Sequence, residues 1–141
     1  MSIFFETGRV RLMVVACGLM LLSACATSTS LSPESQVEER ATARWEAFFR
    51  GDLAAMYMYL SPAYRTSVSS LQYQRSILLR RVAYTSAKYV GSTCQESVCK
   101  VKIDVGYAVS GAVPGVQSFK RTQIIEESWV LIDGQWYLVP A

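Results

Sequence analysis

From Ser32 onward, the apolar positions first recur with the spacing of a helix. Ser32, Pro33 and Glu34 predict a helix start, because Ser caps the first turn, Pro suits the first helical position and an acidic side chain favours the N-terminus. The stripe that follows is apolar and consists of Val37, Ala41, Trp45, Phe48 and Phe49. Gly51 is expected to end this helix.

Two shorter helices are predicted next. Asp52 can cap a helix through residues 53–57, and the segment Leu60-Ser61-Pro62 breaks it. A third helix is expected from Ser70 to about Arg80, and its apolar residues are Leu71, Ile77 and Leu78.

After Arg81 the period of the pattern changes from helical to alternating. The odd positions from Cys99 to Val109 are mostly apolar and the positions between them include lysines and an aspartate, which predicts a strand with one buried face. Residues 82–94 are expected to be its hairpin partner. A Gly/Pro loop at residues 111–115 then leads to a long strand over residues 117–132.

Asp133-Gly134 is a strong signal for a two-residue hairpin turn, after which residues 135–139 return as the last strand. Helices followed by an antiparallel meander predict an α+β domain whose sheet curls around the helices.

The chain resembles the nuclear-transport-factor-2-like superfamily, also called the SnoaL-like fold. The residues that carry the resemblance are 44–48, the Gly51-Asp52 break, and the ending over residues 127–137. It covers roughly residues 34–140, and its motifs mark architecture more than activity. The resemblance implies N-terminal helices packed in the concavity of a curved antiparallel sheet, a cone-shaped, cystatin-like arrangement.

The N-terminus has the pattern of an export signal. Arg9 and Arg11 precede an uncharged run over residues 12–22, which is too short to span a membrane. Leu22-Ser23-Ala24-Cys25 resembles the lipobox of bacterial lipoproteins, which implies cleavage before Cys25 and acylation of Cys25. The alternative is a plain cleavage site with Cys25 as an ordinary thiol.

Three regions are therefore expected. Residues 1–24 are a cleaved lipoprotein signal peptide, residues 25–31 are the lipidated Cys and a flexible tether, and residues 32–141 are the α+β domain. The tether spans about 15 Å on average, which would hold the domain close to its membrane. Ala26 and Thr27 follow the Cys where inner-membrane lipoproteins carry Asp, so the resemblance favours the outer membrane, facing the periplasm.

Cysteine and histidine content limit the chemistry. Once the signal is removed and Cys25 is acylated, Cys94 and Cys99 are left as a pair, and in an oxidising compartment they predict a structural disulfide across a hairpin turn. A redox or metal role is the alternative. The chain contains no His, which excludes Ser-His-Asp and Cys-His hydrolases and His-ligated metals, and we expect neither a metal nor a cofactor.

The alternation of the last two strands predicts an interior pocket. If Asp133-Gly134 is the turn, Trp129, Leu131, Trp136 and Leu138 share the core face. The same face continues back to Glu127, Gln123 and Arg121, which would line a pocket together with Tyr107 and Tyr57. Polar groups at core positions are costly unless they are paired or hydrated. The alternatives are a β-bulge that turns these residues outward, or an ion pair between Arg121 and Glu127.

The opposite face of the sheet is predicted to contact another protein chain. It carries Ile124, Val130, Ile132 and Tyr137, which are too apolar for a face that only meets water. Members of the resembled superfamily often dimerise through this face, so a homodimer or an envelope protein partner is expected there. A covering loop of the same chain is the alternative.

These observations lead to three functional hypotheses. The first is a membrane-anchored, non-enzymatic periplasmic lipoprotein that binds a small apolar ligand or a protein partner. The second is an isomerase- or dehydratase-like enzyme with Glu127 as a buried general base. The third is a structural subunit of an envelope complex. Without residues 1–24 the chain keeps 14 − 2 = 12 basic and 11 − 1 = 10 acidic residues, and a net charge near +2 says little about partners. Export excludes a nucleic-acid partner.

Overall fold

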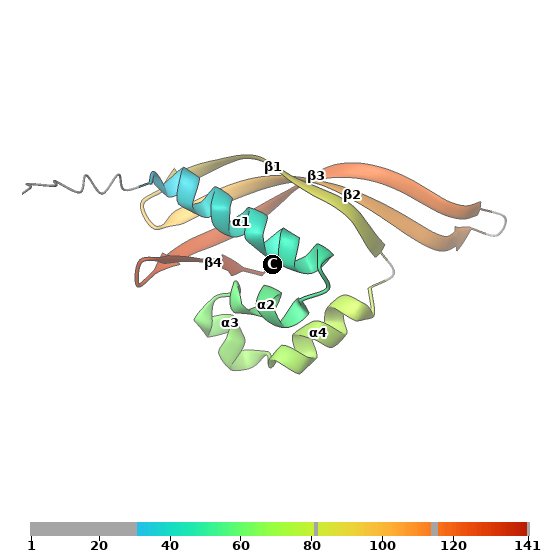
Figure 1. Cartoon of the computed structure of the whole chain (residues 1–141), viewed down its shortest axis with the longest axis horizontal. Coiled ribbons are helices and arrows are strands. Elements are labelled where there is room, and N and C mark those ends of the chain that lie inside the picture. The colour runs from blue at the N-terminus through green and yellow to red at the C-terminus, as the bar shows by residue number, and fades with distance from the viewer. Residues whose placement is uncertain (1–30, 81, 114–115, 141) are drawn as a thin grey trace, which may run out of the picture. The chain divides into compact units, whose positions relative to one another are not determined.

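A computed structural model describes residues 31–80, 82–113 and 116–140. Four helices precede a four-stranded antiparallel sheet with the strand order β1-β2-β3-β4, so the fold is α+β as predicted (Figure 1). The elements are α1 (Pro33–Phe49), α2 (Leu53–Met58), α3 (Pro62–Ser67), α4 (Ser70–Leu78), β1 (Val82–Gln95), β2 (Val98–Val113), β3 (Val116–Ile132) and β4 (Gln135–Val139). The predicted signal peptide, Cys25 and most of the tether lie outside the described residues.

The helix ends follow the local capping signals. The Ser32 hydroxyl accepts a hydrogen bond from the Ser35 backbone N–H at 3.2 Å, and Asp52 Oδ1 accepts from the Ala55 N–H at 2.9 Å. Gly51 adopts a positive φ of 74°, which suits Gly at the end of a helix. The predictions for α1 and α2 are therefore confirmed.

Helix α3 was not predicted. Ser61 caps it and Pro62 opens it, which is the same Ser-Pro start that marks α1. The prediction used Leu60-Ser61-Pro62 only as a break, although the same residues also begin a new helix. The apolar spacing after Pro62 is too short to reveal a helix of six residues.

The strand pairing is close to that expected from the pattern. Asp133 and Gly134 form the β3–β4 turn with positive φ angles of 49° and 77°, and Leu131 pairs with Trp136 as predicted. Strand β2 extends to Val113 and β3 begins at Val116, so the expected Gly/Pro loop is shorter than residues 111–115. Residues 111–113, which were expected in the loop, belong to β2, and Val113 pairs with Val116 across the hairpin.

The core lies where α1 covers one face of the sheet (Figure 1). Trp129 and Trp136 fill its centre, and the odd positions of β2 are buried from Cys99 to Val105. In α4 the apolar prediction was wrong for two residues, because Leu71 and Leu78 are 60% and 73% exposed. Tyr73 is the residue that α4 buries, since its side of the helix faces the core.

The free edge of β4 is covered by the segment between α2 and α3. The Leu138 N–H donates to the Tyr59 carbonyl and the Ser61 N–H donates to the Leu138 carbonyl, both at 2.8 Å. Leu60 and Leu138 form a parallel bridge at this point. An uncovered edge strand would offer unpaired backbone groups to another chain, so this segment protects the sheet.

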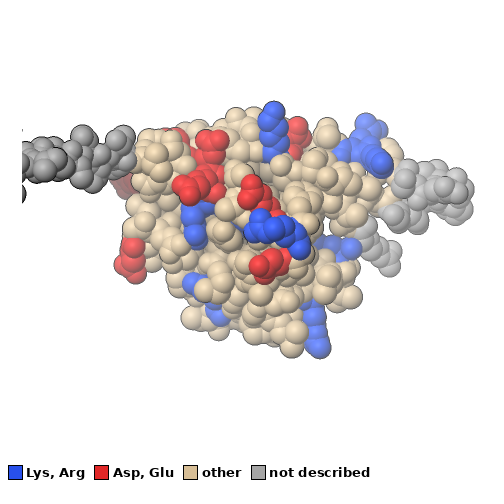
Figure 2. Space-filling view, viewed as in Figure 1, with Lys and Arg blue, Asp and Glu red and all other residues tan. Residues whose placement is uncertain are grey.

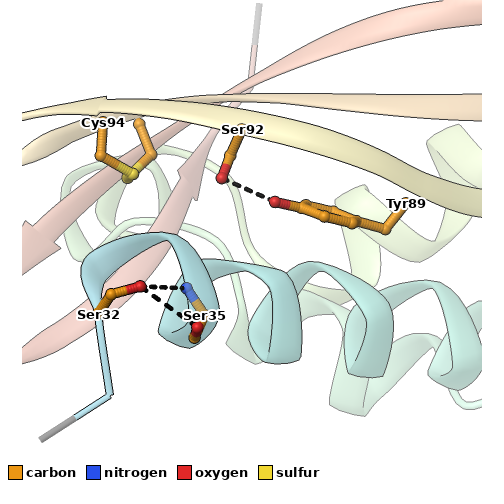
Figure 3. The surroundings of a disulfide bond; sticks show 6 residues. Ser32, Ser35, Tyr89, Ser92 and Cys94 are labelled. Atoms are coloured by element: carbon orange, nitrogen blue, oxygen red, sulfur yellow. Dashed lines mark hydrogen bonds between the residues drawn. A yellow bond between two sulfur atoms is a disulfide. The ribbon is translucent and has the colours of Figure 1, made fainter.

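Cys94 and Cys99 form a disulfide, as the sequence predicted. They are cross-strand partners on β1 and β2, and the bond lies above the first turn of α1, where Ser32 contacts Ser35 (Figure 3). Cys99 is fully buried and belongs to the core, so the bond joins the hairpin end to the packed interior. No helix among the described residues has the length and hydropathy that a membrane span requires.

Candidate functional site

A buried carboxylate lies between α1 and the sheet. Glu127 of β3 is 7% exposed, and its Oε1 accepts hydrogen bonds from Arg44 Nη1 at 2.7 Å and from Trp45 Nε1 at 3.1 Å. Its Oε2 accepts from Trp129 Nε1 at 3.0 Å. The carboxylate is thus paired with a guanidinium and with two indoles inside the core.

Arg44 occupies the side of α1 that faces the sheet, although it was not expected there. Its side chain is 9% exposed and its Nε is buried without a hydrogen-bond partner among the described residues. Burial raises the pKa of the Tyr73 hydroxyl above 10.0, and the nearby Arg44 charge acts in the opposite direction. The ion pair of Arg44 with Glu127 therefore connects α1 to β3.

This arrangement changes the interpretation of Glu127. A general base needs an acceptor oxygen within reach of a substrate proton. Both oxygens of Glu127 already accept hydrogen bonds from side chains that are fixed in the core. Glu127 also does not line the open pocket beside β4. The ion pair expected as an alternative exists, but Arg44 provides the cation in place of Arg121.

The five pocket candidates do not come together. Tyr107 and Arg121 are cross-strand partners, whereas Glu127 pairs with Val101, about 20 Å farther along β2. Arg121 and Gln123 are exposed, although Val105, the partner of Gln123 on β2, is buried. The prediction of an interior pocket is thus not supported by their positions.

Tyr57, the fifth pocket candidate, has a structural role. Its hydroxyl lies 2.8 Å from the Val68 carbonyl and 3.2 Å from the Arg65 carbonyl, and it donates to the end of α3. Its ring packs against Tyr73 at a centroid distance of 5.8 Å. Tyr57 therefore ties α2 to α3 and α4.

The four interface candidates do not form one continuous apolar surface on the outer face of the sheet. Ile124 is 52% exposed, whereas Val130 and Ile132 are half-buried. The face between them is not continuously apolar, because Lys100 bonds Ser128 at 2.7 Å and lies 3.6 Å from Glu126. Tyr137 pairs with Val130 and so stays on this face, but arginines from α1 and α3 lie near its ring.

An open pocket of about 330 Å³ lies beside the β4 edge. It is called the arginine pocket below. Its lining comes from α1, α2, α3, β4 and the residue after α2, and consists of Arg40, Ala55, Met58, Tyr59, Arg65, Gln135 and Tyr137. The elements that cover the β4 edge therefore also build this pocket.

The two guanidiniums of the arginine pocket converge on one ring. The guanidinium carbon of Arg40 lies 4.4 Å from the Tyr59 ring centre, and those of Arg40 and Arg65 each lie 5.9 Å from the Tyr137 ring centre. Arg40 Nε donates to the Trp136 carbonyl at 3.2 Å. With its amide oxygen turned toward Arg40, Gln135 accepts from Nη1 and Nη2 at 2.8 and 3.1 Å.

Sequence reasoning identified only Tyr137 of this pocket, and gave it another role. Arg40 was expected on the solvated side of its helix, and Arg65 lies in the unpredicted α3. The one signal in the sequence is a run without acidic residues between Asp52 and Glu96, which contains Arg65. No group of His, Cys, Asp and Glu among the described residues could hold a metal ion.

The sequence matches no protein-family model and no curated protein sequence. The structure is similar to the solution structure of a SEC-C motif containing protein from Rhodopseudomonas palustris. That protein is 13% identical, the TM-score is 0.57, and the match covers 75% of this chain and 77% of the other. At this identity the likeness concerns the fold alone.

Proposed function

We propose that this protein is a lipid-anchored, non-enzymatic binding protein of the bacterial cell envelope. The observation that carries the non-enzymatic part is the state of Glu127. Both of its oxygens are engaged by Arg44, Trp45 and Trp129, so the best catalytic candidate serves the core. The arginine pocket, by contrast, opens to solvent.

The anchor rests on the sequence of the N-terminus. Basic Arg9 and Arg11, the apolar run and the lipobox-like Leu22–Cys25 segment support acylation of Cys25. Helix α1 begins at Pro33, soon after Cys25, so the domain would stay close to the lipid surface. Two or more acyl chains hold a protein on a membrane much more firmly than one.

The finer fold assignment belongs to the same proposal. A helix that lies along a bent antiparallel sheet, with shorter helices beside it, is consistent with the cone-shaped fold of the nuclear-transport-factor-2-like superfamily (Figure 1). The Trp-rich ending of the chain supports this assignment. Trp129 and Trp136 occupy the core, where the strand alternation placed them.

The partner side of the proposal concerns the outer sheet face. Ile124 and Val98 are exposed there, at 52% and 42%, and they favour a homodimer or an envelope protein partner on this face. Ile124→Lys is expected to shift the sedimentation of any dimer toward the monomer. An unchanged oligomer would exclude Ile124 from the contact.

The anchor is tested by Cys25→Ser in a bacterial host that acylates lipoproteins. We expect the wild-type chain to incorporate labelled palmitate and to fractionate with the outer membrane. The Cys25→Ser chain should incorporate none and appear in the soluble periplasmic fraction. Cys94→Ser serves as the control, because that cysteine forms the disulfide and its loss should leave labelling intact. Membrane retention of an unlabelled Cys25→Ser chain would contradict the proposal.

A further inference from the structure

We infer that the arginine pocket binds a small organic anion, one with a carboxylate or phosphate group on an apolar body. The inference names the ligand class of the binding function proposed above and rests on it for biological meaning. The binding itself depends only on the described residues of the pocket. It differs from the small apolar ligand expected from the sequence.

The charge of the pocket is the first reason. Its lining contains Arg40 and Arg65 and no acidic residue. Among the described residues neither arginine makes an ion pair with a carboxylate; the three ion pairs found there involve other cations. The partners of Arg40 are a backbone carbonyl and an amide, which leave its positive charge uncompensated. The positive charges of Arg40 and Arg65 both lie near the Tyr137 ring, and an anion bound between them would be attracted by both.

The surroundings extend this positive region. No acidic residue occurs between Asp52 and Glu96, so α2 is uncharged, and the charged residues of α3 and α4 are Arg65 and Arg75. Figure 2 shows blue and no red side chains over α3 and α4 on the face that it presents. Such a field raises the local concentration of anions and speeds their association.

The second reason is preorganisation. Arg40 is held by the Trp136 carbonyl and stacks on Tyr59, so its planar fork has a fixed direction. Arg65 is half-buried, and its Nε has no hydrogen-bond partner among the described residues. Its Nη1 reaches only the weak acceptor Met58 Sδ, at 3.5 Å. A carboxylate or phosphate could accept from this guanidinium, because the fork matches both groups.

The remaining lining describes the rest of the ligand. The Tyr59 and Tyr137 rings, Met58 and Ala55 offer apolar contact beside the two cations. A volume of about 330 Å³ is at the lower end for small-molecule sites. The pocket therefore suits a small anion with an aromatic or short aliphatic body, not an extended lipid chain.

The test is titration of the purified protein with benzoate and with phenyl phosphate, followed by amide chemical shifts. Benzamide, which has the same ring and no charge, is the matched control ligand. We expect both anions to shift the amides of residues 58–65 and 135–137, with affinity falling as salt is added. Shifts that benzamide produces equally would overturn the inference, because the charge would then not matter.

Two variants remove the site in different ways. Arg65→Gln removes one cation, and Met58→Glu adds a carboxylate beside it at a position that is 55% exposed. Each should weaken anion binding by about tenfold or more, the effect of one charge-assisted hydrogen bond. Arg75→Gln on the exposed side of α4 is the control and should bind as the wild type does. Equal affinity in wild type and Arg65→Gln would overturn the inference.

A second experiment distinguishes a free small anion from the headgroup of a lipid. Sedimentation with phosphatidylglycerol vesicles, compared between wild type and Arg65→Gln, reports binding of a lipid headgroup. Vesicle binding that depends on Arg65, without any response to the soluble anions, would overturn the assignment to a small free ligand. Failure of these titrations leaves the Cys25→Ser result unaffected, so the anchor and the pocket are tested separately.

Discussion

Glu127→Gln tests whether the buried carboxylate holds the fold or performs chemistry. The substitution keeps the size of the side chain and removes its charge. Arg44 then remains buried, with its side chain 9% exposed, and has no anion to pair with. The amide nitrogen of Gln replaces one carboxylate oxygen and cannot accept a hydrogen bond. Either the Trp45 or the Trp129 indole N–H therefore loses its acceptor.

The expected cost follows from these contacts. Breaking a buried ion pair by removing one partner costs about 3–5 kcal/mol, because an uncompensated charge remains. The amide keeps one acceptor oxygen for Arg44, so the lower end, about 3 kcal/mol, applies. For a domain whose total stability is about 5–15 kcal/mol, that is a large share.

Urea denaturation followed by tryptophan fluorescence measures the effect, since Trp45 and Trp129 contact the carboxylate directly. With a slope near 1.5 kcal/mol per molar, the midpoint should fall by about 2 M. Glu126→Gln is the matched control: the neighbouring carboxylate is exposed, lies 3.6 Å from Lys100 and should contribute less than about 1 kcal/mol.

A double variant sharpens the conclusion. Glu127→Leu combined with Arg44→Met leaves no buried charge, so it should be more stable than Glu127→Leu alone. Glu127→Gln with wild-type stability would refute the structural role. Additive losses in the double variant would refute the coupling between the two residues.

Three further outcomes are expected. Gly106→Ala should destabilise the protein by about 1–3 kcal/mol in a thermal melt, because a Cβ there would collide with two hydroxyls at the β1 bulge, whereas Gly91→Ala, which meets open space, should cost less. Replacing Cys94 and Cys99 by Ser should cost about 2 kcal/mol, measured as the difference in urea midpoint, and a reducing agent should then have no further effect. The raised pKa of Tyr73 means that the folded state holds this proton more tightly than the unfolded chain, so stability should fall as the pH rises through 10.0 and above. Tyr73→Phe should lose less stability over that pH range, and identical pH profiles would contradict the shift.

The sequence by itself determined the features that depend on neighbouring residues. Ser32 and Asp52 cap their helices, and Asp133-Gly134 forms its turn, because each signal acts within a few residues. The alternation of β2 likewise predicted its buried face, since successive side chains of a strand point to opposite sides. From these local features the α+β class and the strand order followed.

Only the tertiary structure decided which polar residues meet. Arg44 and Glu127 are separated by 83 residues, and no local pattern distinguishes Arg44 from the exposed charges around it on α1. Glu127 was placed correctly on the core face, but its partner depends on how the helix crosses the sheet. The hydrogen bonds made by that partner and by the Trp45 and Trp129 indoles favour a structural role for a residue that the sequence offered as a candidate base.

The same limit applies to the arginine pocket. Arg40, Arg65 and Tyr137 come from three separate elements and meet only because the segment after α2 pairs with the free edge of β4. Periodicity assigns a residue to a face of its own helix or strand, and it contains no information about which other element covers that face. Apart from α3, the local elements were therefore predictable from sequence, whereas the site was not.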